Sequence, residues 1–369
     1  MSLRTLTITG LRNLASLQLE LSSRVNLISG INGSGKTSVL EAVHLLSLAR
    51  SFRTSKFKHY IRHGEEACTL FGRVQTPDGG TLPVGVQRDR GGQLKVRIAG
   101  ESVDSLATLA ELVPVQLINA DTFALLEGSP GIRRQFIDWG GFHLEPRFFA
   151  AWKATRRSLQ QRNSLLKYGK LDPSVRATWD SQLVARAQEL DGYRQAYIEA
   201  LIPCFEGLLA KLIEIDDLTL QYYRGWDRHR SLDQVLAEGF DRDRAQGFTQ
   251  QGPQRADLRV KVKGVAAAEI LSRGQQKLVV SALKVAQGYL LKELMGRHCI
   301  YLIDDLPAEL DPGNRRRLCT LLEGMETQVL VTCTEAEAFA GCWSNDIDVR
   351  AFPIHDGTLA TNPVNGSKE

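Results

Sequence analysis

The sequence predicts an α/β fold, in which a nucleotide-binding head with a mixed sheet and an antiparallel meander carries a second, mainly helical lobe. Three observations lead to this prediction. Residues 30–37 fit the phosphate-binding loop pattern, two glycines five positions apart followed directly by Lys and Thr. Residues 1–100 alternate in polarity as strands do. Hydrophobic residues between 145 and about 215 recur at three- and four-residue spacing, which is typical of helices.

The phosphate-binding loop has the context that its chemistry needs, since a buried strand is expected at residues 25–29 and an amphipathic helix at residues 38–48. Glycines let the backbone N–H groups turn toward phosphate oxygens, and the helix N-terminus attracts the same anion. Lys36 would reach the β- and γ-phosphates, and the Thr37 hydroxyl would join a Mg²⁺ shell. The residues expected to hold the nucleotide are Gly30, Ile31, Asn32, Gly33, Ser34, Gly35, Lys36 and Thr37. A glycine turn with a chance Lys-Thr is the alternative, and the order strand, loop, helix disfavours it.

Length and composition narrow the class of protein. A chain of 369 residues has material for two domains or lobes. Its 43% hydrophobic and 24% charged content is ordinary for a globular protein, and a net charge of +4 leans only slightly toward polyanions. We find no signal sequence and no apolar run near the ~20 residues of a membrane span, so we expect a cytoplasmic protein without a membrane partner. Cysteines and histidines lack metal-site spacing, which leaves nucleotide-bound Mg²⁺ as the expected metal.

A basic segment follows the helix of the phosphate-binding loop. Residues 50–62 hold five cations and no acid, with Phe52, Phe57 and Tyr60 interleaved. The cations are Arg50, Arg53, Lys56, Lys58 and Arg62. Cations mixed with aromatic residues suit contact with a DNA backbone, whereas a simple solvated loop explains the charges equally well. Beyond this segment, residues 68–74, 82–88 and 94–98 continue the expected meander.

The helical region predicts a separate lobe of two or three antiparallel helices, broken at Pro173 and Pro203. It is too short and too irregular for a long coiled coil. Its first part is basic, through Arg147, Lys153, Arg156, Arg157, Arg162, Lys167 and Lys170.

A second anion-binding helix N-terminus is expected near residue 272. Residues 271–276 read Leu-Ser-Arg-Gly-Gln-Gln and precede a long helical pattern, and they are a variant of the Leu-Ser-Gly-Gly-Gln signature of ABC-type ATPases. Ser272 offers a hydroxyl, Gly274 an accessible N–H, and the helix a positive dipole. Arg273 and Gln275 complete this set of expected nucleotide contacts.

Two carboxylates follow an apolar strand expected at residues 299–303. Asp304 suits a Mg²⁺ ion held through water, and Asp305 suits the polarisation of an attacking water molecule. Residues 308–311 resemble the loop that crosses between subunits in ABC-type ATPases, so Asp311 is a further candidate contact. Because an Asn-Lys-x-Asp guanine motif is absent from the sequence, ATP is preferred to GTP. Phosphate-binding loop, signature and paired Asp in this order predict an ATPase head of the ABC type.

Over nearly its whole length, the sequence resembles the RecF family of bacterial DNA replication and repair proteins. The resemblance includes Thr-Gly-Leu-Arg-Asn at residues 9–13, Glu-Gly-Ser-Pro-Gly-Ile-Arg-Arg-Gln-Phe-Ile-Asp at 127–138, and Gly-Pro-Gln-Arg-Ala-Asp at 252–257. The last two stretches are absent from transporter ATPases. The family often has Pro, His and Ser where this sequence has Ala120, Gln254 and Ala308, which bears on the geometry of those loops.

This resemblance implies a head related to those of the chromosome-maintenance ATPases, with a helical lobe in place of their coiled coil. It further implies an ATP-dependent homodimer, binding to double-stranded and gapped DNA, and slow DNA-stimulated ATP hydrolysis. The family works with RecO and RecR to load RecA at single-stranded gaps, which supports recombinational repair and the SOS response.

Two residues have open assignments. Gln116, on a short strand expected at residues 115–118, is a candidate for the glutamine that couples the metal to lobe position, or else a polar residue at a strand end. Arg12, after the first strand, either touches a phosphate or caps a turn.

We expect the N-terminal part of the head at residues 1–115, the helical lobe at 116–250 and the C-terminal part of the head at 251–369. The expected function is that of a DNA-binding repair ATPase whose nucleotide state switches a dimer. The alternative is an ATPase subunit of another machine. A transporter component would need a surface for a membrane subunit and no basic lobe, and a nuclease-linked ATPase would need an added acidic metal cluster.

Overall fold

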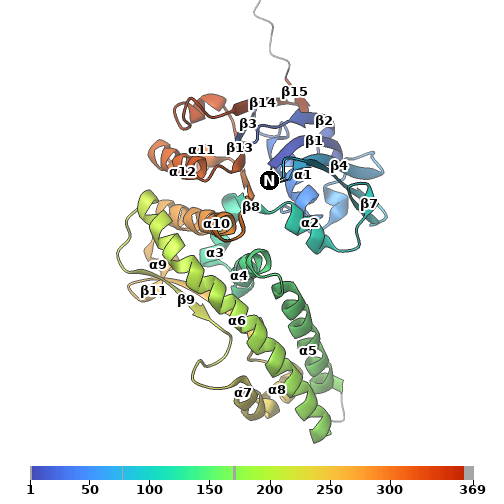
Figure 1. The fold of residues 1–369 in the computed structure, drawn as a ribbon, viewed down its shortest axis with the longest axis vertical. Coiled ribbons are helices and arrows are strands. Elements are labelled where there is room, and N and C mark those ends of the chain that lie inside the picture. The colour runs from blue at the N-terminus through green and yellow to red at the C-terminus, as the bar shows by residue number, and fades with distance from the viewer. Residues whose placement is uncertain (1, 77, 169–171, 361–369) are drawn as a thin grey trace, which may run out of the picture. The chain divides into compact units, whose positions relative to one another are not determined.

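The computed structural model describes residues 2–76, 78–168 and 172–360, and the chain forms two compact units (Figure 1). Unit 1 comprises residues 1–122 and 281–369, and unit 2 comprises residues 123–280. The division falls inside helix α10 (Arg273–Met295). Residues 251–280, which the sequence placed with the head, cluster with unit 2, where β10 (Asp257–Val262) pairs with β9 (Leu218–Tyr223).

Unit 1 contains two six-stranded sheets. The predicted meander is confirmed as the first sheet, in the order β2-β1-β4-β5-β6-β7. Its strands are β1 (Ser2–Leu11), β2 (Leu14–Glu20), β4 (Ala67–Gln75), β5 (Thr81–Asp89), β6 (Leu94–Ile98) and β7 (Glu101–Ser102). The second sheet is mainly parallel, in the order β15-β14-β3-β13-β12-β8. Its strands are β3 (Val25–Ser29), β8 (Val115–Ile118), β12 (Ile300–Ile303), β13 (Gln328–Cys333), β14 (Val349–His355) and β15 (Thr358–Leu359).

Helix α1 (Lys36–Leu48) packs against strands of both sheets. Eleven of its thirteen residues are buried, which explains why the helix is hydrophobic on more than one side. The other short helices of unit 1 are η1 (Phe57–His59), α2 (Leu106–Leu112), α11 (Leu306–Glu309), α12 (Pro312–Gly324) and η4 (Ala336–Phe339), and η2 (Ala120–Phe123) lies at the boundary between the units.

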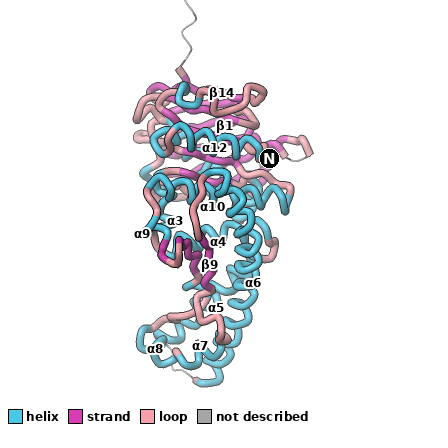
Figure 2. Tube along the Cα trace, turned by 90° about the vertical axis from the view of Figure 1, so that its left-hand side faces the viewer, coloured by secondary structure: helices cyan, strands magenta, loops and turns pink. Residues whose placement is uncertain are grey.

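Unit 2 is mainly helical, as predicted, and also contains a three-stranded antiparallel sheet that the sequence did not predict (Figure 2). Its helices are α3 (Ala124–Glu127), α4 (Pro130–Leu144), α5 (Phe148–Tyr168), α6 (Pro173–Leu212), α7 (Leu232–Glu238), α8 (Phe240–Gln246), η3 (Pro253–Arg255) and α9 (Ala267–Ile270). The sheet has the order β11-β10-β9, where β11 is Val265–Ala266.

The predicted break at Pro203 is wrong, because this proline lies inside α6, a helix of 40 residues that continues to Leu212. Proline removes one N–H from the helix ladder, and this cost is normally enough to bend or end an isolated helix. In α6 the neighbours Leu201 and Phe205 are fully buried, so packing against the rest of unit 2 stabilises the helix on both sides of the proline.

Buried ion pairs connect the elements of unit 2. The Arg133 guanidinium contacts both carboxylate oxygens of Asp257 at 2.6 and 3.2 Å, and Arg134 donates to the Ala256 carbonyl at 2.9 Å. These contacts join two of the sequence stretches typical of the RecF family. Arg162, one of the basic residues of α5, is 3% exposed and binds Asp180 of α6 and Asp243 of α8. Of the predicted basic set, Lys170 lies outside the described residues.

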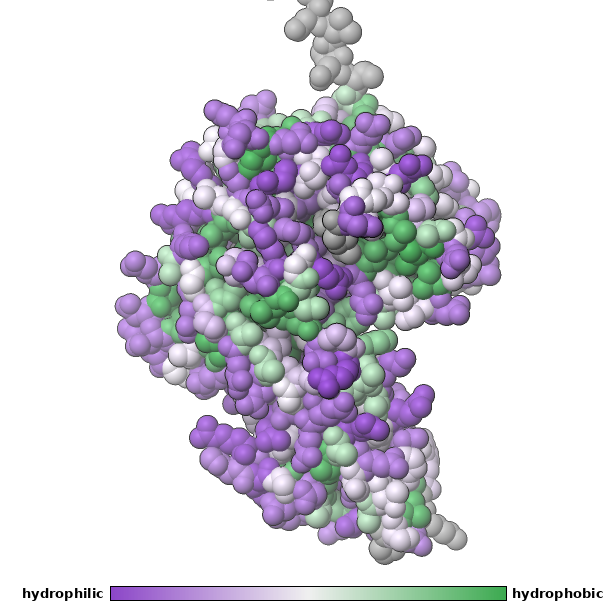
Figure 3. All heavy atoms as spheres, viewed as in Figure 1, coloured by the Kyte–Doolittle hydropathy of each residue, from purple (hydrophilic) through white to green (hydrophobic). Residues whose placement is uncertain are grey.

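The surface carries the expected mixture of polar and apolar side chains. Figure 3 shows hydrophilic residues over most of one face, with hydrophobic patches between them. Within the described ranges, no helix is both long and apolar enough to cross a membrane.

Replacing Arg162 by Met should lower the free energy of local unfolding around α5 by about 3–5 kcal/mol, because two buried or half-buried carboxylates lose their cation. Hydrogen exchange of α5 amides measures this change. The matched control is Arg186→Met, which breaks an exposed ion pair with Glu189 and should cost less than about 1 kcal/mol. Equal effects of the two replacements would show that Arg162 does not hold these helices together.

Candidate nucleotide-binding site

The phosphate-binding loop connects β3 to α1, as the sequence predicted. Gly30 and Gly35 adopt φ angles of 150° and 119°, in the region that favours glycine. A Cβ at Gly30 would lie 2.3 Å from the Ile354 carbonyl oxygen, and one at Gly35 would lie 2.8 Å from Leu14 Cδ2. Both positions therefore require glycine for conformation and for space.

The interior of the loop is buried and its rim is exposed. Ser34 and Lys36 are 2% and 7% exposed, whereas Ile31 on the rim is 64% exposed. Lys36 Nζ donates to the carbonyl oxygens of Gly30 at 2.6 Å and Ile31 at 2.9 Å, which holds the ammonium group within the loop. Ser34 Oγ has no hydrogen-bond partner among the described residues, although it is buried. A buried hydroxyl of this kind fits a site that receives phosphate oxygens from a ligand.

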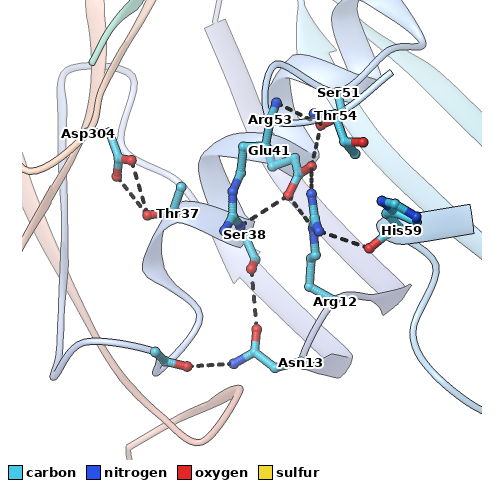
Figure 4. A network of polar contacts seen from close by, with 11 residues as sticks. Arg12, Asn13, Thr37, Ser38, Glu41, Ser51, Arg53, Thr54, His59 and Asp304 are labelled. Carbon is cyan, nitrogen blue, oxygen red and sulfur yellow. Dashed lines mark hydrogen bonds and ion pairs between the residues drawn. The ribbon is translucent and has the colours of Figure 1, made fainter. Parts of the chain in front are cut away.

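The carboxyl ends of the parallel strands meet beside the loop. Thr37 Oγ1 lies 2.9 and 3.1 Å from the two carboxylate oxygens of Asp304, which follows β12 (Figure 4). Thr332 on the neighbouring strand β13 donates its hydroxyl to Asp304 at 2.7 Å and accepts the Asp305 N–H at 2.8 Å. Hydroxyl and carboxylate oxygens are the ligands that Mg²⁺ prefers, so this donor set fits the cation that accompanies a nucleotide.

Asp305 occupies a constrained position directly after Asp304. Its φ is 51°, which is uncommon for a residue other than glycine, and it precedes the first turn of α11. Burial and the neighbouring Asp304 charge raise the pKa of the Asp305 carboxyl, while the nearby Lys36 charge opposes this shift. A half-buried carboxyl with a raised pKa is a candidate for proton transfer.

Gln116 lies away from this group of residues. It is 2% exposed and donates to Gln287 of α10 at 3.1 Å. Gln116 lies two residues before Ile118, the last residue of β8, and three residues before Asn119, which lies at the carboxyl edge of the sheet. From the rise of a strand per residue, the Cα of Gln116 is therefore about 10 Å from this edge. Asn119 itself follows Ile118, the register partner of Ile303, and therefore lies beside Asp304. Asn119 was not among the predicted site residues, although its place directly after an expected strand could have indicated it.

Arg12 forms an ion pair that neither sequence-based assignment includes. Its guanidinium contacts both carboxylate oxygens of Glu41 at 2.8 and 2.9 Å and donates to the His59 carbonyl at 2.9 Å (Figure 4). Glu41 lies in α1, one turn after Thr37, and its side chain is fully buried. It also accepts from Ser51 Oγ and lies 3.5 Å from Arg53 Nη1. Glu41 therefore anchors the start of the basic segment, residues 50–62, to α1 directly, and its partner Arg12 binds the segment near the other end, at His59.

Asn13 is a second residue that the site assignment missed, although it belongs to the family-like stretch at residues 9–13. Its side-chain amide donates to the Gly33 carbonyl at 3.1 Å, and its amide oxygen accepts from Ser38 at 3.2 Å. Its main-chain carbonyl accepts from Arg62 at 2.5 Å. Asn13 thus connects the phosphate-binding loop, α1 and the basic segment.

The five predicted DNA contacts differ in exposure and in contacts. Arg50, Arg53, Lys56 and Lys58 are exposed, and Arg62 is half-buried. Arg53 and Arg62 also make the contacts with Glu41 and Asn13 described above. The interleaved aromatic residues are not available for base stacking, because Tyr60 is 3% exposed and Phe52 and Phe57 pack partly buried against the core.

The signature residues lie in unit 2, at the start of α10. Ser272 and Gln275 form a capping box: the Ser272 N–H donates to Gln275 Oε1 at 2.9 Å, and the Gln275 N–H donates to Ser272 Oγ at 3.3 Å. Ser272, Arg273 and Gly274 are exposed, and Arg273 forms an ion pair with Glu127. The exposed start of a 23-residue helix is suited to an anionic ligand.

Asp311 has a local role in unit 1. Its Oδ1 accepts the N–H groups of Gly313 and Asn314, each at 3.0 Å, so it is the N-cap of α12. These hydrogen bonds, led by the Asn314 N–H, lower the pKa of the Asp311 carboxyl. Among the residues described by the structure, no group of three His, Cys, Asp or Glu could hold a metal ion by itself.

Comparison with known proteins supports the resemblance. The family model of the RecF/RecN/SMC N terminal domain matches residues 2–355. The chain is 53% identical over 359 residues to the DNA replication and repair protein RecF of Pseudomonas putida strain GB-1, covering 97% of this chain and 98% of that protein. It is 50% identical over 368 residues to the protein of the same name from Pseudomonas aeruginosa strain LESB58, covering 100% of both chains.

Solved structures show a similar fold. One, described as the recombination mediator protein RecF-ATP in the RecFOR pathway, has a TM-score of 0.84 at 24% identity and covers 97% of both chains. An Smc head bound to the C-winged helix domain of ScpA has a TM-score of 0.60 at 16% identity, covering 97% of this chain and 96% of that chain. The predicted relationship of the fold to ATPase heads of this class is therefore confirmed.

Replacing Glu41 by Gln should release the basic segment. Arg12 and Arg53 would lose the carboxylate charge that they share, and charge-assisted hydrogen bonds of this kind contribute about 1.5–3 kcal/mol. We expect trypsin to cleave within residues 50–62 roughly ten times faster or more, because cleavage follows the population of the open segment. The control Glu20→Gln changes an exposed carboxylate on β2 and should leave cleavage unchanged. Equal protection in the Glu41 and Glu20 variants would contradict the anchoring role.

Proposed function

The chain belongs to the RecF family of DNA replication and repair proteins, and we propose that it is an ATP-dependent DNA-binding protein of recombinational repair and replication-fork maintenance. In this proposal ATP closes a homodimer on double-stranded or gapped DNA, and slow DNA-stimulated hydrolysis opens it. The protein would act in the cytoplasm with RecR and RecO, help to load RecA at gaps and support the SOS response. The observation that carries the proposal is the convergence of Lys36, Thr37 and Asp304 at the phosphate-binding loop.

ATP and Mg²⁺ are the proposed ligands. The loop N–H groups, the buried Ser34 hydroxyl and Lys36 would bind phosphate oxygens, and Thr37 and Asp304 would hold the cation. Mg²⁺ in such sites neutralises charge on the β- and γ-phosphates. A solved structure with the same fold is described as RecF-ATP, which supports ATP as the nucleotide.

Asp305 is the proposed residue that positions and polarises the attacking water. Its main-chain N–H is held by Thr332, and its raised pKa favours acceptance of a proton. Asp is one methylene shorter than Glu, so its carboxylate reaches less far from the strand. Slow turnover is therefore part of the proposal.

A dimer is proposed because each chain offers two different anion-binding helix N-termini. One lies behind the phosphate-binding loop at Lys36, and the other is the exposed signature at Ser272 and Gly274. In a head-to-tail pair, each ATP would contact the loop of one chain and the signature of the other. A ligand that contacts both chains stabilises the dimer by its greater affinity for the closed state.

The exposed cations of the basic segment are the proposed duplex-DNA contacts. Arg50, Lys56 and Lys58 are exposed, and Glu41 and Asn13 hold the segment against the nucleotide-binding helix. Two copies in a closed dimer would each add their phosphate contacts, so ATP would raise the apparent affinity for DNA through effective concentration.

Two replacements should separate nucleotide binding, dimerisation and hydrolysis. Ser272→Arg should leave ATP binding by the monomer intact and abolish ATP-induced dimerisation, because the arginine blocks the signature.

Asp305→Asn should bind ATP with nearly unchanged affinity, lower kcat and accumulate the dimer, because a water-positioning carboxylate acts mainly in the transition state. Sedimentation with ATP, nucleotide-binding titration and phosphate release measure these quantities.

Lys36→Ala is the reference for these two variants, since it should lose nucleotide affinity itself. A Ser272→Arg variant that dimerises normally would refute the shared site. An equal loss of affinity in Asp305→Asn and Lys36→Ala would make Asp305 a ligand of the nucleotide or its metal.

Replacing Lys56 and Lys58 by Ala should weaken binding to all duplex sequences alike and flatten the log–log salt dependence by about 1.8 units, from roughly 0.9 per phosphate contact. Fluorescence anisotropy with ATP and gapped duplex at several salt concentrations measures the slope. The control Lys95→Ala with Arg97→Ala removes the same charge from β6 in the same unit and should leave the slope unchanged. An unchanged slope in the Lys56 and Lys58 variant would place the duplex elsewhere.

A further inference from the structure

The three-stranded sheet of unit 2 ends in a strand with an open edge. The order of this sheet is β11-β10-β9, so β9 has a neighbouring strand on one side only. The Lys263 N–H donates to the Asp217 carbonyl at 3.2 Å, in the same register that pairs β9 with β10. Because hydrogen-bonded positions alternate along an antiparallel pair, the main-chain groups of Leu218, Leu220 and Tyr222 point away from β10. No main-chain group in the described ranges pairs with them on that side.

A hollow of about 660 Å³ lies between the end of β9 and helix α6, which β9 contacts (Figure 1). This volume is typical of ligand sites. One side of the hollow is formed by positions of α6 that are three and four residues apart and therefore share one face of the helix: Gln195, Ile198, Glu199 and Ile202. The opposite side is formed by Tyr222, Tyr223 and the loop that follows them, as far as His229.

The wall of the hollow combines aromatic rings with cations that already have partners. Arg224 lies 3.9 Å from the Trp226 ring centroid and pairs with Asp191 at 3.1 Å, and Arg228 Nε donates to His229 at 2.9 Å. Trp226 is 0% exposed, and its indole N–H has no hydrogen-bond partner among the described residues. A buried donor without an acceptor fits a site that a ligand completes.

The surface along the open edge is negative. Strand β9 itself carries no charged residue. Exposed carboxylates lie along α6 and in the turn into β9, and none of them forms an ion pair with a described cation: Glu199, Glu206, Glu214, Asp216 and Asp217. Glu206 continues the row of positions 195, 199 and 202 on α6. A second copy of this edge would bring like charges together, whereas a basic segment would neutralise them.

We propose that the open edge of β9 is a docking site for an extended, basic segment of a partner protein, which adds a fourth strand to this sheet. Main-chain hydrogen bonds to Leu218, Leu220 and Tyr222 supply affinity, and pockets for alternate side chains give specificity. An apolar side chain of the segment enters the hollow beside Ile198 and Ile202, and its lysines or arginines pair with the carboxylates along the edge. The site uses neither the phosphate-binding loop nor the cations proposed to bind DNA, so the inference goes beyond the proposed function.

The test measures fluorescence anisotropy of a labelled peptide of about seven residues in which lysine alternates with valine, a length that matches β9. Two further peptides carry N-methyl groups either on all valines or on all lysines, so each lacks one register of N–H groups at unchanged charge. One of them should bind at least tenfold more weakly, because it loses its main-chain hydrogen bonds to β9, and the other should bind like the parent peptide. A slip by one residue does not restore binding, since it turns the lysines toward the hollow.

Replacing Glu199 and Glu206 together by Gln should weaken binding of the parent peptide roughly three- to tenfold, because two ion pairs at the surface are lost. The matched control replaces Asp233 and Asp241 by Asn, which removes the same charge from exposed positions of α7 and α8 and should leave binding unchanged. ATP binding should be unchanged in both variants.

Four outcomes would overturn the inference. The parent peptide does not bind, the two methylated peptides bind alike, or the two double variants have equal effects. In the fourth, the protein forms a dimer without nucleotide and the parent peptide dissociates it in sedimentation, which would assign the open edge to a second copy of this chain.

Discussion

The burial of α1 between two sheets is the constraint on which unit 1 depends. A helix that is covered on nearly all sides must satisfy every polar group that it carries. Glu41 does so with Arg12, Ser51 and Arg53, which are the contacts that hold the basic segment. Burial also lowers the pKa of His44 to about 4, so this imidazole is neutral near pH 7 and pairs with the Arg50 carbonyl at 2.8 Å.

The same burial fixes the chemistry at the start of α1. Because the helix cannot move relative to the two sheets without breaking these contacts, Lys36 and Thr37 keep their place beside the carboxyl ends of β12 and β13. Asp304 and Thr332 come from those two ends, where parallel strands present their following residues at one edge. The hydrogen bond between Thr37 and Asp304 therefore depends on tertiary packing and not on sequence proximity, since 267 positions separate the two residues.

Unit 2 combines a buried apolar core with buried arginines that connect its elements. Arg133, Arg162 and Arg194 each pair with carboxylates from other elements, and each is 14% exposed or less. Breaking a buried pair of this kind costs much stability, so the Arg133–Asp257 pair couples the family-like stretches at 127–138 and 252–257. In the same unit, the support of Trp152 by Asp138 and Arg194 shows how a structural ion pair can also orient a surface ring.

Local sequence was sufficient to predict the phosphate-binding loop, the meander, the helical character of unit 2 and the paired Asp residues, because these follow from local spacing, glycine chemistry and hydrophobic period. Which polar residues act together depends on how the chain packs. Glu41 and Thr332 have no distinctive local pattern, and the family-like stretch that contains Asn13 does not reveal its contacts; the roles of all three arise from contacts with distant parts of the chain. The same holds for Arg162 and Tyr60, since charge and aromatic character in a sequence do not reveal burial. Pro203 shows the limit most clearly, because packing in α6 outweighs the local preference of proline to end a helix.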